Sequence, residues 1–167
     1  FGGDLVVKAG FGNRFTLTND QTPFALKQAA AFLVETTDGV GFEAGQMVGI
    51  TVLVDASGSG NINNAIAVLN GSFTLAELGF IAVGLPEPII IKQGDVYIIF
   101  TDLSDDADDT VIPVLLEENG GVADGRAYAV LSTGTPNPSL TSGYTDLLND
   151  SMVLGNCIVR GFGDPAA

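Results

Sequence analysis

The stretch TDLSDDADDT, residues 101–110, is a dense run of carboxylates directly after an apolar segment. Calcium takes six to eight oxygen ligands and suits flexible, Asp-rich loops. The sequence therefore predicts that calcium, the candidate cofactor, binds this run. The DASGSGN segment at 55–61 would supply a further ligand if the two loops share an end of the domain. The predicted metal ligands are Asp102, Ser104, Asp105, Asp106, Asp108, Asp109 and Asp55.

A solvated loop that holds no metal is the second interpretation of this run. The twelve-residue calcium loop of helix–loop–helix proteins has a glycine at its sharp turn and a closing bidentate glutamate. The run lacks both. A pair of catalytic carboxylates is a third interpretation, but nothing nearby suggests a substrate cleft. Calcium binding and a solvated loop both remain open on the sequence alone.

Histidine is absent from the sequence. This excludes Ser-His-Asp and Cys-His catalytic groups and His-ligated zinc. Cys157 is the single cysteine, so an intrachain disulfide is excluded and a small core residue is expected. We predict that the protein is not an enzyme.

The charge of the chain is strongly acidic. Its 167 residues include 20 Asp and Glu against 6 Lys and Arg, for a net charge of −14 at pH 7. Nucleic acids and anionic membranes are bound through lysine and arginine, so neither is an expected partner. The apolar runs are shorter than the roughly 18 residues of a membrane helix, so membrane insertion is not expected. We expect an extracellular or cell-surface location.

The elements that must position these residues are predicted to be short strands. Segments rich in Val, Ile, Phe and Thr alternate with Gly, Asn, Asp and Ser at the spacing typical of a β-sandwich. We predict a single domain over residues 1–167 that folds as an all-β, antiparallel, jelly-roll-like sandwich of about 8–10 strands. The predicted strands are 13–19, 29–37, 47–56, 64–71, 80–85, 88–93, 95–102, 111–118, 125–132 and 151–162.

Three segments that overlap these strands carry further information. Residues 24–35 and 61–71 also have the composition or the apolar spacing of a helix, so a helix stays an alternative for each. Residues 95–102 are apolar on both alternating faces, which predicts a central strand or one whose outer face is covered. The preceding Gly94-Asp95 pair is typical of a tight reversal.

The segment ITVLVDASGSGN, residues 50–61, ends a predicted strand in Asp-x-Ser-x-Ser. It resembles the metal-ion-dependent adhesion motif of von Willebrand factor A-type domains, where such oxygens hold a divalent cation. In that family the motif opens the domain, and helices separate it from a later strand that ends in Thr-Asp. Here a long segment precedes Asp55 and β-rich segments follow it. The spacing therefore argues against this resemblance.

A second resemblance covers nearly all of residues 11–163. Its pieces, in order, are NRFTLTNDQTPFALKQAAAFLVE, GQMVGITVLVDASGSGNINNAIAVL, LPEPIIIKQGDVYIIF, DGRAYAV and NCIVRGFG. Together they resemble the jelly-roll-like β-sandwich accessory modules of secreted bacterial subtilisin-like peptidases and surface proteins. Tryptophan, frequent in that family, is absent here. The resemblance implies an accessory domain that is not itself catalytic.

We predict a non-catalytic, extracellular structural or interaction module that calcium stabilises. Its expected partners are other domains of a larger secreted protein or copies of itself. One alternative is a self-assembling fibre or surface-layer subunit, in which residues 1–12 form an exchangeable strand that completes a neighbour's sheet. The other is a carbohydrate-binding domain, for which Tyr97, Tyr128 and Tyr144 are the candidate stacking residues.

Arg160 alternates with Ile158 and Phe162 on one face of the predicted closing strand. A lone cation in so acidic a domain is expected to bind a carboxylate near a sheet edge. The alternative is a surface arginine whose charged end lies in solvent.

Overall fold

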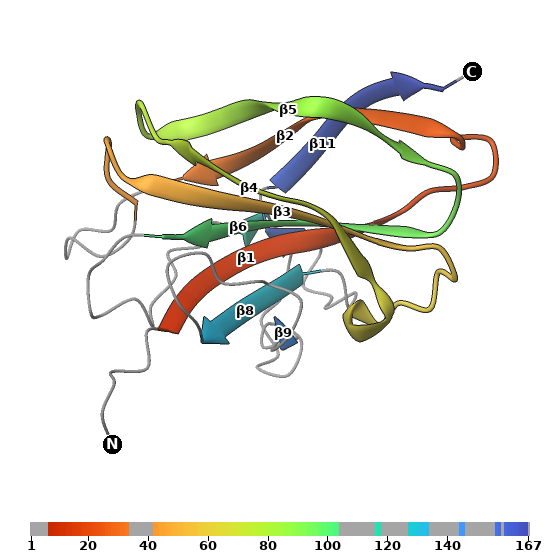
Figure 1. Cartoon of the computed structure of the whole chain (residues 1–167), viewed down its shortest axis with the longest axis horizontal. Coiled ribbons are helices and arrows are strands. Elements are labelled where there is room, and N and C mark those ends of the chain that lie inside the picture. Colours follow the sequence, from red (N-terminus) through yellow and green to blue (C-terminus); the bar gives the residue numbers. More distant parts are fainter. Residues whose placement is uncertain are drawn as a thin grey trace.

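Two antiparallel β-sheets packed face to face form the sandwich seen in the computed structural model (Figure 1). The structure describes residues 7–33, 42–103, 116–117, 127–133, 144–145, 156–157 and 159–166. A turn of 3-10 helix, η1 (Ile62–Asn64), precedes the fourth strand. The strands are β1 (Val7–Thr16), β2 (Phe24–Leu33), β3 (Met47–Asp55), β4 (Ile66–Thr74), β5 (Gly79–Ile91), β6 (Asp95–Asp102), β7 (Leu116–Glu117), β8 (Ala127–Thr133), β9 (Tyr144–Thr145), β10 (Asn156–Cys157) and β11 (Val159–Pro165).

The larger sheet has the strand order β4-β3-β6-β1-β8-β9, and the smaller sheet has the order β11-β2-β5. The short strands β10 and β7 pair separately. Every pairing in the two sheets is antiparallel. The predicted all-β antiparallel sandwich is thus confirmed. Among the described residues, no helix has the length and hydropathy needed to cross a membrane.

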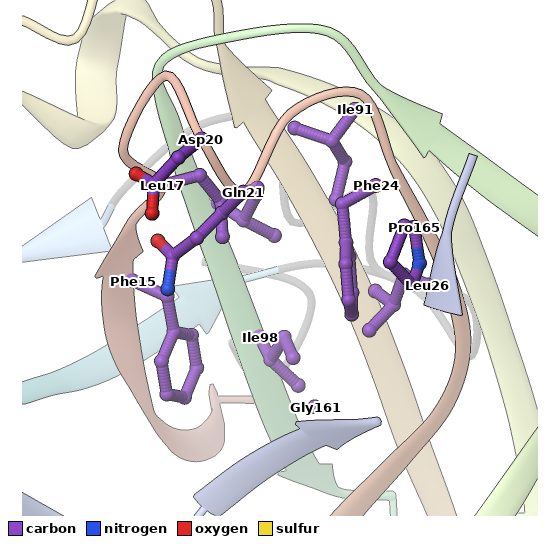
Figure 2. Close-up of a pocket in the computed structure, with 11 residues that line it drawn as sticks. Phe15, Leu17, Asp20, Gln21, Phe24, Leu26, Ile91, Ile98, Gly161 and Pro165 are labelled. Atoms are coloured by element: carbon purple, nitrogen blue, oxygen red, sulfur yellow. The ribbon is translucent and has the colours of Figure 1, made fainter. Parts of the chain in front are cut away.

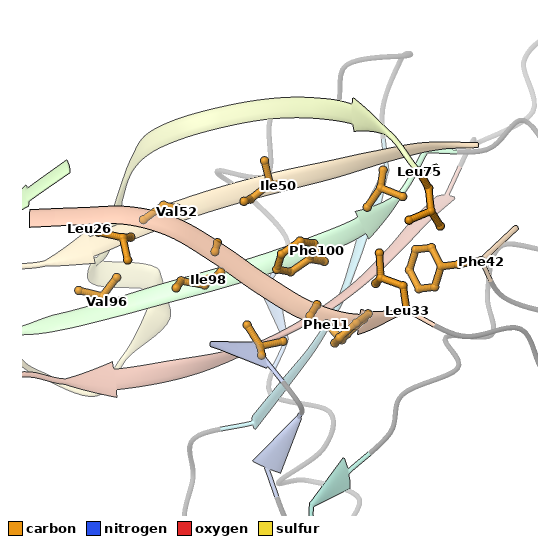
Figure 3. Close-up of a cluster of buried hydrophobic side chains, with 14 of the residues drawn as sticks. Phe11, Leu26, Leu33, Phe42, Ile50, Val52, Leu75, Val96, Ile98 and Phe100 are labelled. Carbon is orange, nitrogen blue, oxygen red and sulfur yellow. The ribbon is translucent and has the colours of Figure 1, made fainter. Parts of the chain in front are cut away.

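The main hydrophobic core fills the space between the two sheets (Figure 3). Phe11 of β1 is central to it, because its ring lies 6.1 Å from the ring of Phe42 and 6.4 Å from that of Phe100. Alternate residues of each strand contribute, as expected for facing sheets. The buried members are Phe11, Leu26, Ala29, Ala31, Leu33, Phe42, Val48, Ile50, Val52, Leu75, Ile91, Val96, Ile98, Phe100 and Val159.

Strand β6 is central and covered on both faces, as its sequence predicts. It lies between β3 and β1. One alternating set of its side chains enters the main core, while Tyr97 and Ile99 belong to a second buried cluster on the other face. Leu53 of β3 and Ile62 of η1 complete that cluster. The segment that carries η1 therefore covers the outer face of the larger sheet at this point.

The helix alternatives are both wrong. Residues Phe24–Leu33 form β2, which pairs with β5 on one side and with β11 on the other. Its buried alanines allow close packing against the facing sheet. In the segment 61–71, only Ile62–Asn64 adopt a helical turn before β4 begins. Tertiary pairing overrides local propensity in both cases.

The predicted strands 80–85 and 88–93 are one continuous strand, β5. Pro86 and Pro88 are tolerated because β5 is an edge of its sheet, where a missing N–H breaks no ladder hydrogen bond. The Gly94-Asp95 pair does not close a hairpin, since β5 and β6 belong to different sheets. It carries the chain from the smaller sheet to the larger one.

Strand β1 is an interior strand of the larger sheet. It pairs with β6 from Gly10 to Thr16 and with β8 from Val7 to Asn13. Residues 7–12 of the predicted exchangeable segment therefore pair within their own chain. The first six residues lie outside the described part of the structure.

Candidate functional site

The two predicted metal ligands that the structure describes, Asp55 and Asp102, lie at opposite ends of the sandwich. In the antiparallel register of β3 and β6, Asp55 is opposite Asp95, and Asp102 is opposite Val48. Seven residues of strand separate the two ends, which corresponds to about 24 Å at the usual rise per residue. Asp55 and Asp102 are therefore too far apart to bind the same calcium ion, and the rest of the predicted ligand set stays a prediction.

The rest of the acidic run is not tested by the structure. Ser104, Asp105, Asp106, Asp108 and Asp109 lie outside the described residues. Asp102 Oδ1 accepts a hydrogen bond of 2.6 Å from Gln46 Nε2, which joins the end of β6 to the start of β3. In the ranges that the structure describes, no group of three or more acidic, cysteine or histidine side chains could hold a metal ion. Calcium binding by the run stays a prediction.

Asp55 organises the loop that follows β3. Its Oδ1 accepts hydrogen bonds from the Ser57 N–H at 3.0 Å and the Ser57 hydroxyl at 2.6 Å. Its Oδ2 accepts from the Ser59 N–H at 2.9 Å and the Ser59 hydroxyl at 2.6 Å. These bonds, those of Ser57 first and then those of Ser59, lower the pKa of Asp55 to about 2.

Asp95 fixes the same loop from the other side. Its Oδ2 accepts the Gly60 N–H at 3.0 Å, and its Oδ1 accepts the hydroxyl of Thr16 at 2.6 Å. The guanidinium of Arg14 lies directly against the Gly60 backbone. The Asp-x-Ser-x-Ser pattern thus works here as a loop-forming network. The strands around it are antiparallel and no α-helix occurs in the described ranges, which agrees with the spacing argument against an adhesion domain.

A pocket of about 380 Å³ opens between the two sheets at the same end of the sandwich (Figure 2). Its floor is made of core side chains from both sheets, and its walls are half-buried aromatic and aliphatic groups. Asp20 and Gln21 of the loop between β1 and β2 stand at its edge (Figure 2). We call this the inter-sheet pocket; it is lined by Phe15, Leu17, Asp20, Gln21, Phe24, Leu26, Ile91, Val96, Ile98, Gly161 and Pro165.

A second concavity of about 370 Å³ lies on the outer face of the smaller sheet. We call it the sheet hollow. It differs from the inter-sheet pocket because polar and apolar groups share its lining. The residues that line it are Lys27, Gln28, Gly84, Phe162, Gly163 and Asp164.

Irregular pairing produces the sheet hollow. The register of β2 against β5 shifts between Leu26 and Gln28, and the register of β11 against β2 shifts after Phe162. Such bulges re-aim side chains, and here Lys27 and Gln28 are both exposed although they are adjacent in a strand. Gly84 is opposite Gln28, and no atom lies within 4 Å of where its Cβ would be. Because Gly84 has no side chain, the space beside Gln28 stays open and forms the sheet hollow.

The rim of the sheet hollow carries an aromatic ring and a charged pair. Phe162 is 45% exposed. Lys27 Nζ lies 2.5 Å from Asp164 Oδ2, and both side chains are at least half exposed. A flat ring, an amide and an ion pair thus surround one concavity.

The sequence did not identify these residues as a site. Of the three tyrosines predicted to stack on sugars, Tyr97 is completely buried and cannot do so. The side chains of Tyr128 and Tyr144 lie outside the described part. The alternation of the closing strand predicts that Phe162 shares a face with Arg160, and the pairing of both with β2 confirms this. The described contact of Arg160 is from Nη1 to the Val159 carbonyl at 3.0 Å, so its carboxylate partner stays a prediction.

Comparison with known proteins gives a fold and no family. No family model matches the sequence, and no curated protein matches it. The chain is similar to the solved cysteine protease and lectin-like domains of Cwp84, a surface-layer-associated protein of Clostridium difficile. The TM-score is 0.53 at 14% identity, over 95% of this chain and 32% of that one.

A second solved structure, the clostridial cysteine protease Cwp84 after propeptide cleavage, gives a TM-score of 0.54 at 13% identity. The match covers 99% of this chain and 38% of that one. The chain thus spans about a third of the length of the proteins it resembles. At these identities the likeness establishes the fold.

Proposed function

We infer that this chain is a non-catalytic, glycan-binding accessory module of a surface-associated bacterial protein. The sheet hollow is its sugar site. The observation that carries this proposal is the exposed ring of Phe162 beside hydrogen-bonding side chains in one concavity. The sequence left three non-catalytic functions open: a structural or interaction module, a fibre or surface-layer subunit, and a carbohydrate-binding domain. This arrangement favours the carbohydrate-binding domain.

The chemistry of the sheet hollow suits a pyranose. A sugar has an apolar face of C–H groups that packs on an aromatic ring, and a periphery of hydroxyls that needs donors and acceptors. Phe162 offers the ring. Gln28 offers both a donor and an acceptor, and the Lys27–Asp164 pair offers charged partners, which form the stronger hydrogen bonds.

The charge of the protein narrows the class of glycan. Lys27 is already neutralised by Asp164, and the chain carries a net charge of −14. Acidic sugars would therefore be repelled. Neutral glycans, including N-acetylated ones, are the proposed ligands. The fold likeness to a structure that contains a lectin-like domain supports glycan binding in general.

The test is titration with neutral oligosaccharides, such as N,N′-diacetylchitobiose, cellobiose and maltose, followed by calorimetry and by amide chemical shifts. For the ligand that binds, Phe162→Ala is expected to weaken affinity about tenfold through loss of stacking. Phe80→Ala is the matched control, because Phe80 is 49% exposed on the same sheet but does not line the sheet hollow. Equal losses of affinity from the two substitutions, or no loss from either, would contradict the assignment of the sugar site to the sheet hollow.

A further inference from the structure

We propose that the inter-sheet pocket binds a small organic cation with a hydrocarbon body, an alkylammonium ion being the simplest member of the class. The proposal stands apart from glycan binding, since it concerns a different cavity on different elements. Its basis is the shape of the pocket, the apolar character of its lining and the sign of the charge at its mouth.

The volume and the lining of the inter-sheet pocket are typical of a ligand site. Its volume of about 380 Å³ falls in the range typical of small-molecule cavities, which are mostly apolar with a few polar groups at fixed positions. Its floor comprises the fully buried side chains of Leu26, Ile91, Val96 and Ile98, contributed by both sheets. A hydrocarbon group placed there would leave water for an environment that is already preformed.

The walls of the pocket leave room for a narrow apolar body. Phe15 lies on one side, and Phe24 lies on the other (Figure 2). Gly161 contributes no side chain at the floor, and a Cβ there would meet the terminal methyls of Ile98 and Leu26 at 2.9 Å. The glycine therefore keeps this part of the cavity open.

The mouth of the pocket selects the sign of the ligand's charge. Asp20 is the one ionisable side chain among the described lining residues. A hydrogen bond from the Thr18 hydroxyl fixes its carboxylate and is the main cause of its lowered pKa, so the group is charged at neutral pH. The net charge of −14 adds a field of the same sign. An anionic amphiphile such as a fatty acid is disfavoured for the same reasons.

Gln21 completes the edge of the pocket without reversing this preference. Its Oε1 accepts the Thr18 N–H at 2.9 Å, which holds the amide in place. Figure 2 shows the side chain reaching from the loop toward Phe15. The amide is neutral, so Asp20 alone sets the charge of the lining.

The experiment compares three probes that share one body: n-octylammonium, n-octanol and octanoate, each below its aggregation concentration. Binding to the intact chain is followed by methyl and amide chemical shifts. Octylammonium should bind roughly two- to fivefold more tightly than octanol, the range for an exposed ion pair, and octanoate should bind most weakly. Hexylammonium should bind roughly tenfold more weakly than octylammonium, because two methylenes are lost. The shifts should centre on Leu26, Ile91 and Val96.

Two substitutions separate the charge from the cavity. Asp20→Asn keeps an acceptor for Thr18 and should reduce the preference for octylammonium over octanol, because only the field of the net charge then remains. Glu87→Gln, an exposed carboxylate outside the pocket, should leave that preference unchanged. Gly161→Ala should weaken all three probes by pushing neighbouring methyls into the cavity.

Three results would overturn the proposal. These are octanoate binding as tightly as octylammonium, shifts that centre elsewhere, and the absence of binding by any probe at millimolar concentration. The Asp20 and Glu87 variants alter exposed side chains, so they keep the test informative even if Gly161→Ala does not fold.

Discussion

Asp55 and Asp95 face each other across β3 and β6, and both side chains are buried, at 3% and 2% exposure. Two adjacent buried carboxylates would ordinarily repel each other. Here each is engaged by a separate set of donors, Ser57 and Ser59 for Asp55, and Thr16 and Gly60 for Asp95. The pair thereby fixes the loop between β3 and β4 to the end of β1.

This arrangement predicts a component of acid sensitivity that belongs to Asp55. Its pKa is lowered from the ordinary value of 3.8 to about 2 by hydrogen bonds to the charged form. A group whose folded pKa is depressed stabilises the fold above its unfolded pKa, and this contribution is lost as the pH falls through the folded value. The free energy of unfolding should therefore decrease between about pH 4 and pH 2.

Asp55→Asn isolates that component. At neutral pH the substitution should lower the free energy of unfolding by about 1–3 kcal/mol, since an amide cannot accept all four hydrogen bonds. The difference between wild type and variant should shrink as the pH is lowered from 5 to 2, measured by urea unfolding at each pH. Glu87→Gln, on the exposed edge strand β5, should change little at any pH. A difference that stays constant with pH would contradict the assignment to Asp55.

Gly94 is expected to be intolerant of any side chain for two separable reasons. Its φ of +89° is a conformation that L residues rarely adopt. A Cβ there would also overlap the backbone carbonyl oxygen of Asp55. Gly45 has a φ of +91° but open space around its Cβ position, so it supplies a matched control.

Gly45→Ala should therefore lower stability by about 1–2 kcal/mol through backbone strain alone. Gly94→Ala should cost at least about 1–2 kcal/mol more, because the steric overlap is with backbone that cannot rotate away. Thermal and urea unfolding of the two variants measure the difference. Equal losses would mean that the loop at Asp55 moves to make room, and the two carboxylates would then not be fixed as described.

The sandwich could be predicted from the sequence because the patterns that indicate its strands lie within short segments. In β6, apolar residues on both faces indicated a strand covered on both sides, and the structure confirms it. In β2, the run of alanines at 29–31 also suited a helix. What decides the strand is pairing with β5 and β11, which lie far away in the sequence. Composition alone carries no information about those partners.

The candidate site was harder to predict because it depends on register. Asp55 and Asp102 each end an apolar strand, and nothing in either segment says that the two strands run antiparallel to each other as neighbours. The sheet hollow likewise arises where two registers shift and Gly84 meets Gln28. The one signal in the sequence is the alternation that puts Arg160 and Phe162 on the same face of the closing strand.

The place of β1 yields a prediction about assembly. A donor-strand polymer requires that the donated strand leave its own chain, yet β1 is hydrogen-bonded on both sides within this one. It also contributes Phe11 to the core. The chain is therefore expected to be monomeric by light scattering over a wide concentration range. Phe11→Ala should lower the free energy of unfolding by about 3–5 kcal/mol. Polymers that form at low concentration would restore the fibre alternative.

The last prediction concerns the acidic run from Asp102 to Asp109, whose described residue Asp102 lies at the other end of the sandwich from Asp55. If the run binds calcium, ligation stabilises the folded state by RT ln(1 + [L]/Kd), about 2.7 kcal/mol at a hundredfold excess over Kd. For a domain of this size the melting temperature should rise by about 5–10 °C. Simple screening of the carboxylates would also stabilise the loop, but sodium would then act almost as well at equal ionic strength.

The experiment is a melt in calcium against sodium at matched ionic strength, for wild type and for the double variant Asp106→Asn, Asp108→Asn. A shift specific to calcium that disappears in the double variant supports a site in the run. Asp55→Asn is now an informative control: because Asp55 lies at the other end of β3, it should lower the melting temperature in both salts and leave the calcium increment intact. Equal shifts in the two salts for wild type would identify the run as a solvated loop. The prediction that the run binds calcium would then be wrong.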